Sequence, residues 1–406
     1  MTKQLFAPTR TAALERLQSF VPKAGAYASK RNYDISGHPH VSVLSPYIRH
    51  RVLTEVEVLQ AVLGRYAPST VEKYVQEVFW RTYWKGWLEM RPSVWSDYKQ
   101  AVHSSWNDVQ TQSGMRSEWE AACKGETGID CFDHWAKELV QTGYLHNHAR
   151  MWFASIWIFT LRLPWALGAD FFLRHLLDGD PASNTLSWRW VGGLHTKGKT
   201  YLARPDNIAK YTEGRFRPTG LATHAEPLTG MPNPERSPLP EAGELITGAR
   251  TGLLITEDDT SIGWIVDQVT PVATACLNAS AHRSPLHVAP SVHSFTQDLI
   301  SDGAARYSER IGTQAGFIDA EQLAQWANEQ GLDQVVTSYV PVGPARDALK
   351  PAQRALSDKG ITLTQLRRPY DTAAWPHATH GFFRFKDKIP SLLGRIRGVR
   401  LADSQT

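Results

Sequence analysis

The sequence predicts two structural parts, an all-α half followed by an α/β half with a mainly parallel sheet. Residues 142–190 contain long apolar stretches at helical spacing. Six prolines between residues 218 and 243 mark a linker. Beyond the linker, short apolar runs alternate with helical patterns, which indicates a parallel sheet with crossover helices. The predicted domains are 1–225 and 245–406, joined by a proline-rich linker at 226–244.

Length and composition fit a protein with two cores. The chain has 406 residues, of which 42% are hydrophobic, and this is enough for sizeable cores. No apolar stretch approaches the roughly 20 residues that a helix needs to cross a bilayer, and the N-terminus lacks a signal-peptide core. We therefore expect a cytoplasmic monomer without a membrane partner.

The formal net charge of +4 is unevenly distributed. Residues 1–234 hold 27 Lys and Arg against 21 Asp and Glu, and the remainder holds 17 against 19. The basic half suits contact with a phosphate backbone, although many proteins that never bind DNA carry such an excess. Cys123, Cys131 and Cys276 lack the spacing of a disulfide framework or a metal site, so reduced thiols and no metal are expected.

The most informative stretch begins at His146. His146, Asn147 and Arg150 share one helix face, since residues three and four apart are neighbours on a helix. The residues from 151 to 161 carry no charge, which is typical of a helix buried on most sides. Arg150 and Asp178 are candidates for a buried ion pair, because a charge in an interior needs a partner. Taken alone, such a pair is more often an ordinary core salt bridge.

The run HNHARM, followed by Trp165 and then by DGDPASN and WRW, resembles the flavin-binding domain of the photolyase/cryptochrome family. The match keeps the order and the density of the family's motifs. The resemblance implies that FAD is the cofactor and that Arg150 and Asp178 pair beside the flavin ring. It places Asp180 at the polar edge of the ring and Asn184 opposite flavin N5.

A degenerate form of the family's phosphate-contacting loop lies nearer the N-terminus. Tyr27 precedes the segment VSVLS at 41–45, where the family has a tyrosine and then Thr-Ser-Arg-Leu-Ser. Valines replace the threonine and the arginine. The resemblance therefore leaves Ser42, Leu44 and Ser45, with backbone N–H groups at the next helix start, to hold the pyrophosphate. Without the resemblance this segment would be interpreted as a helix cap.

A helix predicted at 69–90 carries Glu77, Trp80 and Arg81 in the family's Glu-x-x-Trp-Arg spacing. Alone, this triplet would be a core tryptophan beside a surface ion pair. The resemblance assigns Arg81 to the cofactor, and Glu77 and Trp80 to a cavity for a flipped-out pyrimidine dimer. The resemblance also assigns Asn147, His148, Met151 and Trp190 to the lesion. Asn147 is assigned to the cofactor as well, and Glu77 and Asn147 are assigned to catalysis. His148 stands where many photolyases have arginine, so the type of lesion stays open.

The resemblance also implies a chain of tryptophans that carries electrons to the flavin. Trp188 and Trp165 match its proximal and middle positions. The spacing around the distal position departs from the family's, so Trp106 is assigned to that role and Trp95 is the alternative. Packing in a helical core is the competing explanation for all of them, and for Trp106 it is the commoner one.

The part after the linker is predicted to be a Rossmann-like α/β domain. A strand at 253–256 leads to Asp258 and Asp259, which we interpret as a solvated loop rather than a metal site. The further predicted elements are helices at 293–311, 319–330 and 344–358 and strands at 334–340 and 361–366. The segments VVTSYVPVGPARDALKPAQRAL and FFRFKDKIPSLL resemble the closing parts of the family's α/β domain, which normally comes first. The chain therefore resembles a circularly permuted photolyase.

The resemblance implies a light-driven DNA repair enzyme, a carbon–carbon lyase that acts on UV-damaged DNA. In this reaction a reduced flavin excited by blue light gives an electron to a pyrimidine dimer, which splits and returns it. A cryptochrome-like photoreceptor without repair activity is the alternative, and a flavoprotein with a dark redox activity is a third option. No segment matches an antenna-contacting loop, so a folate or deazaflavin antenna stays open.

Overall fold

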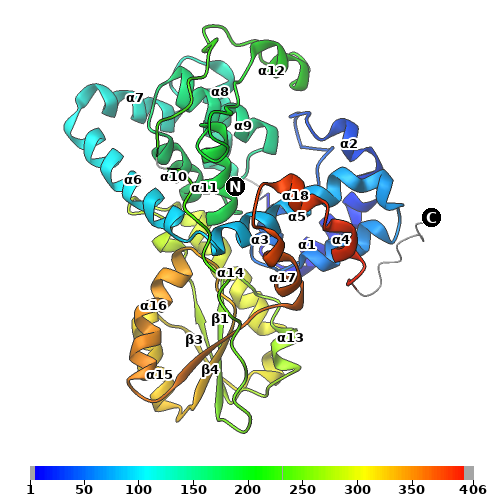
Figure 1. The fold of residues 1–406 in the computed structure, drawn as a ribbon, viewed down its shortest axis with the longest axis vertical. Coiled ribbons are helices and arrows are strands. Elements are labelled where there is room, and N and C mark those ends of the chain that lie inside the picture. Colours follow the sequence, from blue (N-terminus) through cyan, green and yellow to red (C-terminus); the bar gives the residue numbers. More distant parts are fainter. Residues whose placement is uncertain (1–4, 231, 397–406) are drawn as a thin grey trace.

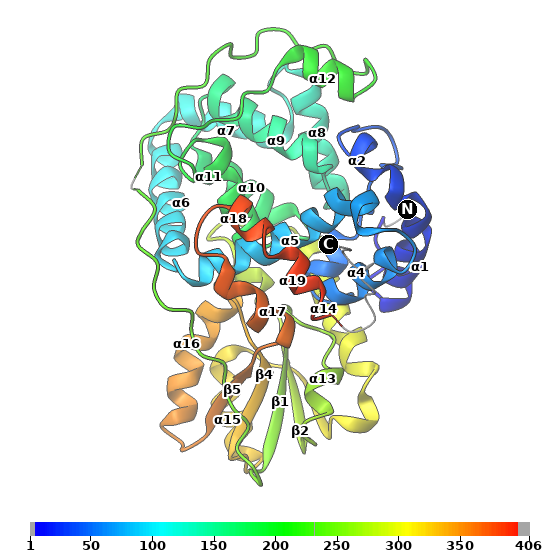
Figure 2. The same ribbon diagram turned by 45° about the vertical axis from the view of Figure 1, so that its right-hand side comes forward.

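The computed structural model describes residues 5–230 and 232–396. Figures 1 and 2 show a helical part standing on an α/β part. The helices of the helical part are α1 (Arg10–Phe20), α2 (Tyr27–Lys30), α3 (Ser45–Arg49), α4 (Glu55–Leu63), α5 (Pro68–Glu89), α6 (Ser93–Thr111), α7 (Ser113–Lys124), α8 (Asp130–Thr142), α9 (Asn147–Ser155), α10 (Trp165–His175), α11 (Pro181–Val191) and α12 (Pro205–Tyr211). Within the described residues, no helix combines the length and the apolar character that crossing a bilayer requires.

The α/β part follows an extended segment, close to the predicted linker, in which residues 215–230 and 232–246 form neither helix nor strand. Its elements are β1 (Thr251–Thr256), α13 (Gly263–Val266), β2 (Ala273–Leu277), α14 (Pro290–Ala305), β3 (Thr313–Phe317), α15 (Leu323–Glu329), β4 (Gln334–Ser338), α16 (Pro344–Ser357) and β5 (Thr362–Leu366). Three short helices end the described chain: α17 (Pro369–Ala374), α18 (Phe382–Lys386) and α19 (Ile389–Leu393).

The strands form one parallel sheet in the order β3-β2-β1-β4-β5. Gly252 in β1 is opposite Ala273 in β2, and Thr251 is opposite Gln334 in β4. The three inner strands are buried along their whole length, as expected when helices cover both faces of a parallel sheet. The predicted fold class, an all-α domain followed by an α/β domain, is therefore confirmed. From β1 the chain builds the sheet outward through β2 to β3, and it then returns to add β4 on the other side of β1. The strand order therefore reverses between β1 and β4, and parallel sheets commonly bind ligands at such a point.

Local signals in the sequence explain how the main helices of the helical part begin and end. The α4 helix starts with a capping box in which Thr54 and Glu57 satisfy each other's backbone groups. The α5 helix begins with Pro68 in its first turn, where proline loses no hydrogen bond. The α9 helix continues into a π-helical turn at Ile156–Thr160 and ends before Pro164, which cannot extend a helix.

The largest core joins both ends of the described chain. Phe6 packs on Tyr47 and Phe295, and Phe382 and Phe385 of α18 pack on the aromatic face of α5. Buried residues between 374 and 396 belong to this helical core and not to the clusters around the sheet. The stretch predicted as an α/β domain therefore contributes residues to both parts, while the predicted domain boundaries themselves stay a prediction.

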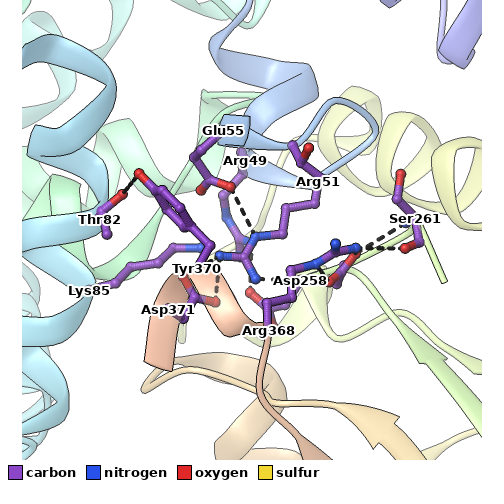
Figure 3. Close-up of polar contacts among 12 residues, drawn as sticks. Arg49, Arg51, Glu55, Thr82, Lys85, Asp258, Ser261, Arg368, Tyr370 and Asp371 are labelled. Atoms are coloured by element: carbon purple, nitrogen blue, oxygen red, sulfur yellow. Dashed lines mark hydrogen bonds and ion pairs between the residues drawn. The ribbon is translucent and has the colours of Figure 1, made fainter. Parts of the chain in front are cut away.

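A buried ion network joins the two parts (Figure 3). Arg49 of α3 contacts Asp258 at 2.7 Å, and Arg51 contacts Asp371 of α17 at 2.7 Å. Asp259 accepts a hydrogen bond from Arg368 at 2.8 Å. The interpretation of Asp258 and Asp259 as a solvated loop is wrong, because both carboxylates are buried. Their arginine partners lie more than 100 residues away in the chain, so no local pattern reveals them.

Candidate functional site

The candidate site lies between α5, α9 and the turn that links α10 to α11. Arg150 Nη2 donates to Asp178 Oδ2 at 2.8 Å, and Arg150 Nε donates to the carbonyl of Leu145 at 2.9 Å. The expected ion pair is therefore present. Burial alone would raise the pKa of Asp178, but Arg150 and a hydrogen bond from Ser45 lower it overall. Asp178 is thus a carboxylate at neutral pH.

Polar atoms without a partner gather beside this ion pair. Arg81 Nε, Arg81 Nη2 and Asp178 Oδ1 are buried and form no hydrogen bond within the protein. The charge of Arg81 acts on both Asp178 and Asp180, so these groups lie close together. Buried polar atoms are almost always hydrogen-bonded in native proteins. Two donors and one acceptor without partners fit the polar edge or the phosphates of FAD.

The segment expected to contact the phosphates has an unusual backbone. Val43 has a φ of 51°, a left-handed conformation that is rare for a β-branched residue. Leu44 is fully buried and precedes α3, which starts at Ser45, while Ser42 stays partly exposed. Backbone strain of this kind often occurs where a loop binds a ligand. A phosphate-binding role for this loop stays a prediction.

Tyr27 and the two remaining residues assigned to the cofactor are placed as follows. Tyr27 packs edge-on against Tyr74 with ring centroids 5.1 Å apart, and burial raises its pKa. Asp180 caps α11 by accepting from Ser183 N at 2.8 Å, and Lys85 lies 3.6 Å from it. Asn184 Nδ2 donates to the carbonyl of Ala169 at 2.8 Å. Asp180 is therefore already engaged by a cation of the protein, whereas Asn184 is oriented by the α10 backbone.

Some of the residues assigned to the lesion already contact other side chains of the protein. Glu77 pairs with Arg31 at 2.8 Å, and burial raises its pKa. The ring of Trp80 is stacked on Phe382 of α18, with centroids 3.7 Å apart and an interplanar angle of 11°. Asn147 is exposed at the start of α9. An aromatic side chain from the C-terminal part of the chain thus occupies the Trp80 ring face.

His148 has structural partners on either side. Its Nδ1 lies 3.0 Å from the carbonyl of Asn32, and its Nε2 lies 3.3 Å from the hydroxyl of Tyr201. Burial lowers the pKa of His148 to about 4, so it is neutral at pH 7. Trp190 packs against Tyr201 with centroids 5.8 Å apart, and Met151 is half-buried one turn after His148. His148 therefore does not supply the positive charge of the arginine that it replaces.

The tryptophans assigned to electron transfer occupy different environments. Trp188 is buried and packs on Trp157 and Phe172. Trp165 contacts Tyr98, and Tyr98 contacts Trp95. The distal candidate Trp106 packs on Trp119 instead. The ring contacts favour Trp95, the alternative, over Trp106 as the continuation from Trp165, and both assignments stay predictions.

Sequence reasoning missed several residues that shape the site. Phe382, Arg31 and Lys85 contact assigned residues that lie 46 to 302 positions away in the chain. His146 caps α9 by accepting from His148 N at 3.2 Å, and burial lowers its pKa to about 3. The cap could have been predicted, because a polar residue precedes the helix, but the other contacts depend on tertiary packing.

Comparison with known proteins identifies the helical part. Residues 74–218 match the family described as the FAD binding domain of DNA photolyase, and this range holds most of α5 and all of α9 and α11. This part of the chain is therefore similar to the flavin-binding domain of the photolyase/cryptochrome family, as its motifs predict. FAD is the cofactor of this family of domains, and the unpartnered groups around Arg81 fit it.

Curated relatives carry the name deoxyribodipyrimidine photo-lyase. The protein from Agrobacterium fabrum is 30% identical over 197 residues, which are 47% of this chain and 39% of the relative. The protein from Alkalihalophilus pseudofirmus is 30% identical over 222 residues, 54% of this chain and 45% of the relative. The chain thus spans less than half of the length of these relatives.

Two solved structures are also similar to part of this chain. A class III photolyase from Agrobacterium tumefaciens is 28% identical, with a TM-score of 0.43 over 51% of this chain and 43% of that chain. A cryptochrome from Synechocystis is 21% identical, with a TM-score of 0.42 over 51% of this chain and 44% of that chain.

Proposed function

We propose that this chain is a light-driven flavoprotein that splits pyrimidine dimers in DNA, as a photolyase does. The observation that carries the proposal is the Arg150–Asp178 pair with the unpartnered donors of Arg81 beside it, in the part that matches the FAD binding family. The photo-lyase names of the relatives and the positive charge of residues 1–234 support DNA as the partner.

Each residue of the site has a physical task in this proposal. A bound, reduced FAD supplies an electron when it absorbs blue light. Arg81 and Arg150 hold positive charge beside the cofactor, and Asp178 keeps Arg150 in place through the 2.8 Å bond. The Ala169 carbonyl fixes the amide of Asn184, so that this side chain needs no reorganisation when the cofactor changes charge.

A repair assay tests this proposal. The purified protein is given a reductant, blue light and an oligonucleotide that carries one thymine dimer, with a dark control and a parallel substrate that carries a (6-4) photoproduct. We expect light-dependent restoration of the thymines. Bound flavin that is photoreducible, without repair of either lesion, would overturn the proposal.

A cryptochrome-like photoreceptor is the second candidate, and the stack of Phe382 on Trp80 favours it. An aromatic ring that faces Trp80 at 3.7 Å leaves no room for a base on the same side. If this stack prevents repair, the Phe382→Ala variant should repair dimers better than the parent protein. Phe383→Ala is the matched control, because the Phe383 side chain is 81% exposed. Equal activity of all three proteins would remove the argument for this candidate.

A further inference from the structure

A second cavity lies where α5 ends, beyond the residues of the candidate flavin site. Its volume is ≈ 480 Å³, and it is lined by Trp87, Arg91, His195, Lys197 and Asn233, among others. Cavities that bind small molecules in proteins are roughly 300–1,000 Å³ in volume. The cavity is therefore large enough for a ligand of nucleotide size.

Hydrogen bonds between distant segments build the walls of this cavity. Arg189 of α11 donates to Asn233 Oδ1 at 3.0 Å, and Asn233 Nδ2 donates to the carbonyl of His195 at 2.7 Å. Arg91 Nη2 donates to the carbonyl of Thr379 at 2.9 Å. The end of α5, the loop after α11, the extended segment and the C-terminal part are thus joined around one hollow.

Two nitrogen atoms of lining residues are buried and lack a hydrogen-bond partner: Arg91 Nη1 and His195 Nδ1. Aromatic contacts restrain the orientation of both side chains. The Arg91 guanidinium lies 4.4 Å from the centre of the Trp87 ring, and the His195 ring lies 4.9 Å from that of Trp87. An unpaired buried donor costs free energy, so the walls favour a ligand that accepts hydrogen bonds.

The charge at the cavity is positive. Arg91 and Lys197 line the cavity, Arg189 lies behind its lining residue Asn233, and none of the described lining residues is acidic. Burial, together with the charges of Arg189 and Arg91, lowers the pKa of His195 to about 4. Asp97 is the acidic residue whose charge acts on Arg189. Excess positive charge and unpaired donors together select for an anion.

We propose that this cavity binds a phosphate group, with Arg91 and Lys197 as its cationic contacts and His195 as a further hydrogen-bonding partner. The guanidinium fork matches the geometry of phosphate oxygens. Because the cavity is larger than a phosphate ion, the group belongs to a larger molecule. That molecule is either a small phosphorylated compound, such as a nucleotide, or a nucleic-acid strand. The proposal requires neither light nor the repair reaction, so it stands apart from the proposed function.

Calorimetry with three probes tests the proposal: inorganic phosphate, adenosine monophosphate and a short single-stranded oligothymidylate, with acetate as the reference anion. We expect at least one phosphate probe to bind and acetate to bind at least tenfold more weakly. Lys197→Gln should weaken that binding about fivefold or more. Lys199→Gln is the matched control, because Lys199 is exposed in the same loop but does not line the cavity.

Nuclear magnetic resonance titration of the His195 ring shows whether a probe binds in this cavity. A bound phosphate should raise the pKa of His195 from about 4, which distinguishes this cavity from the flavin site. A shift with adenosine monophosphate indicates a small phosphorylated ligand, and a shift with the oligonucleotide alone indicates a strand. No shift with any probe, or equal binding by the Lys197→Gln and Lys199→Gln variants, would overturn the proposal. Because Lys197 is exposed, its variant should fold even where Arg91→Gln does not.

Discussion

Arg51 and Arg81 illustrate two regions of buried charge with opposite character. Arg51, in the network between the two parts, has the carboxylates of Asp371, Glu55 and Asp259 at 2.7, 3.3 and 3.8 Å. Arg81, in the candidate flavin site, has two buried nitrogen atoms without a partner. The network is neutralised by the protein itself, whereas the site needs a ligand to complete its hydrogen bonds. We therefore propose that the same residue type serves structure in one region and cofactor binding in the other.

The largest effect is expected from Arg51→Met, which would break the network. The variant leaves three carboxylates without their central cation, and an uncompensated buried charge costs about 3–5 kcal/mol of unfolding free energy. Urea unfolding measures the loss. Lys99→Met is the control, because Lys99 pairs with Asp347 at the surface and exposed ion pairs contribute less than about 1 kcal/mol. Equal losses in the two variants would contradict a structural role for the network.

Acid should lower the stability of the folded protein, because buried histidines beside the candidate site are neutral in the folded state. The pKa of His148 is about 4 in the folded protein, below the ordinary value of about 6.5. As the pH falls from 6.5, the unfolded chain takes up the proton first, so stability falls by at most about 1.4 kcal/mol per pH unit. We expect His148 alone to contribute about 2 kcal/mol of the loss by pH 4.5, measured as a lower urea midpoint.

The matched variants for the acid experiment are His148→Asn and His224→Asn. His148→Asn should lose less stability on acidification than the parent protein, because the buried group that resists protonation is gone. His224 is exposed beside Glu226, so its variant should follow the parent curve. If His148→Asn also follows the parent curve, other groups cause the acid sensitivity.

The smallest change in stability is expected from Arg81→Met, and this variant sharpens the comparison most. Since no group of the protein bonds to its buried nitrogen atoms, the unfolding free energy of the flavin-free protein should change by less than about 1 kcal/mol. The dissociation constant for FAD should rise about tenfold or more, because a hydrogen bond from a charged group contributes about 1.5–3 kcal/mol. Flavin absorbance after dialysis measures the retention. A large loss of stability with unchanged FAD binding would reverse the assignment of Arg81.

Elements with a local signal could be predicted from the sequence. The helix expected at 69–90 is α5 at Pro68–Glu89, and the strand expected at 361–366 is β5 at Thr362–Leu366. The β3 strand was missed because all five of its residues are exposed, so it lacks the apolar pattern of an inner strand. The inner strand β2 was also missed, although all of its residues are buried, so hydrophobic periodicity found only part of the elements that face a core.

Contacts between distant segments could not be predicted. The Arg150–Asp178 pair could be proposed because both residues lie in one recognisable motif. The partners of Asp258 and the stack of Phe382 on Trp80 join positions more than 200 residues apart, and no spacing rule relates such positions. The sequence therefore predicts which residues form the site. It does not predict which of their faces the C-terminal helices cover.

The placement of α18 and α19 in the helical core also constrains how the chain folds as it is synthesised. Domains generally fold as units while the chain emerges from the ribosome. Here the α5 surface lacks its partner Phe385 until the whole sheet has been made, because α18 follows β5 in the chain. The part of the aromatic face of α5 that α18 covers therefore stays exposed during most of translation, and the cavity beside Trp87 is complete only once Gly381 has been made.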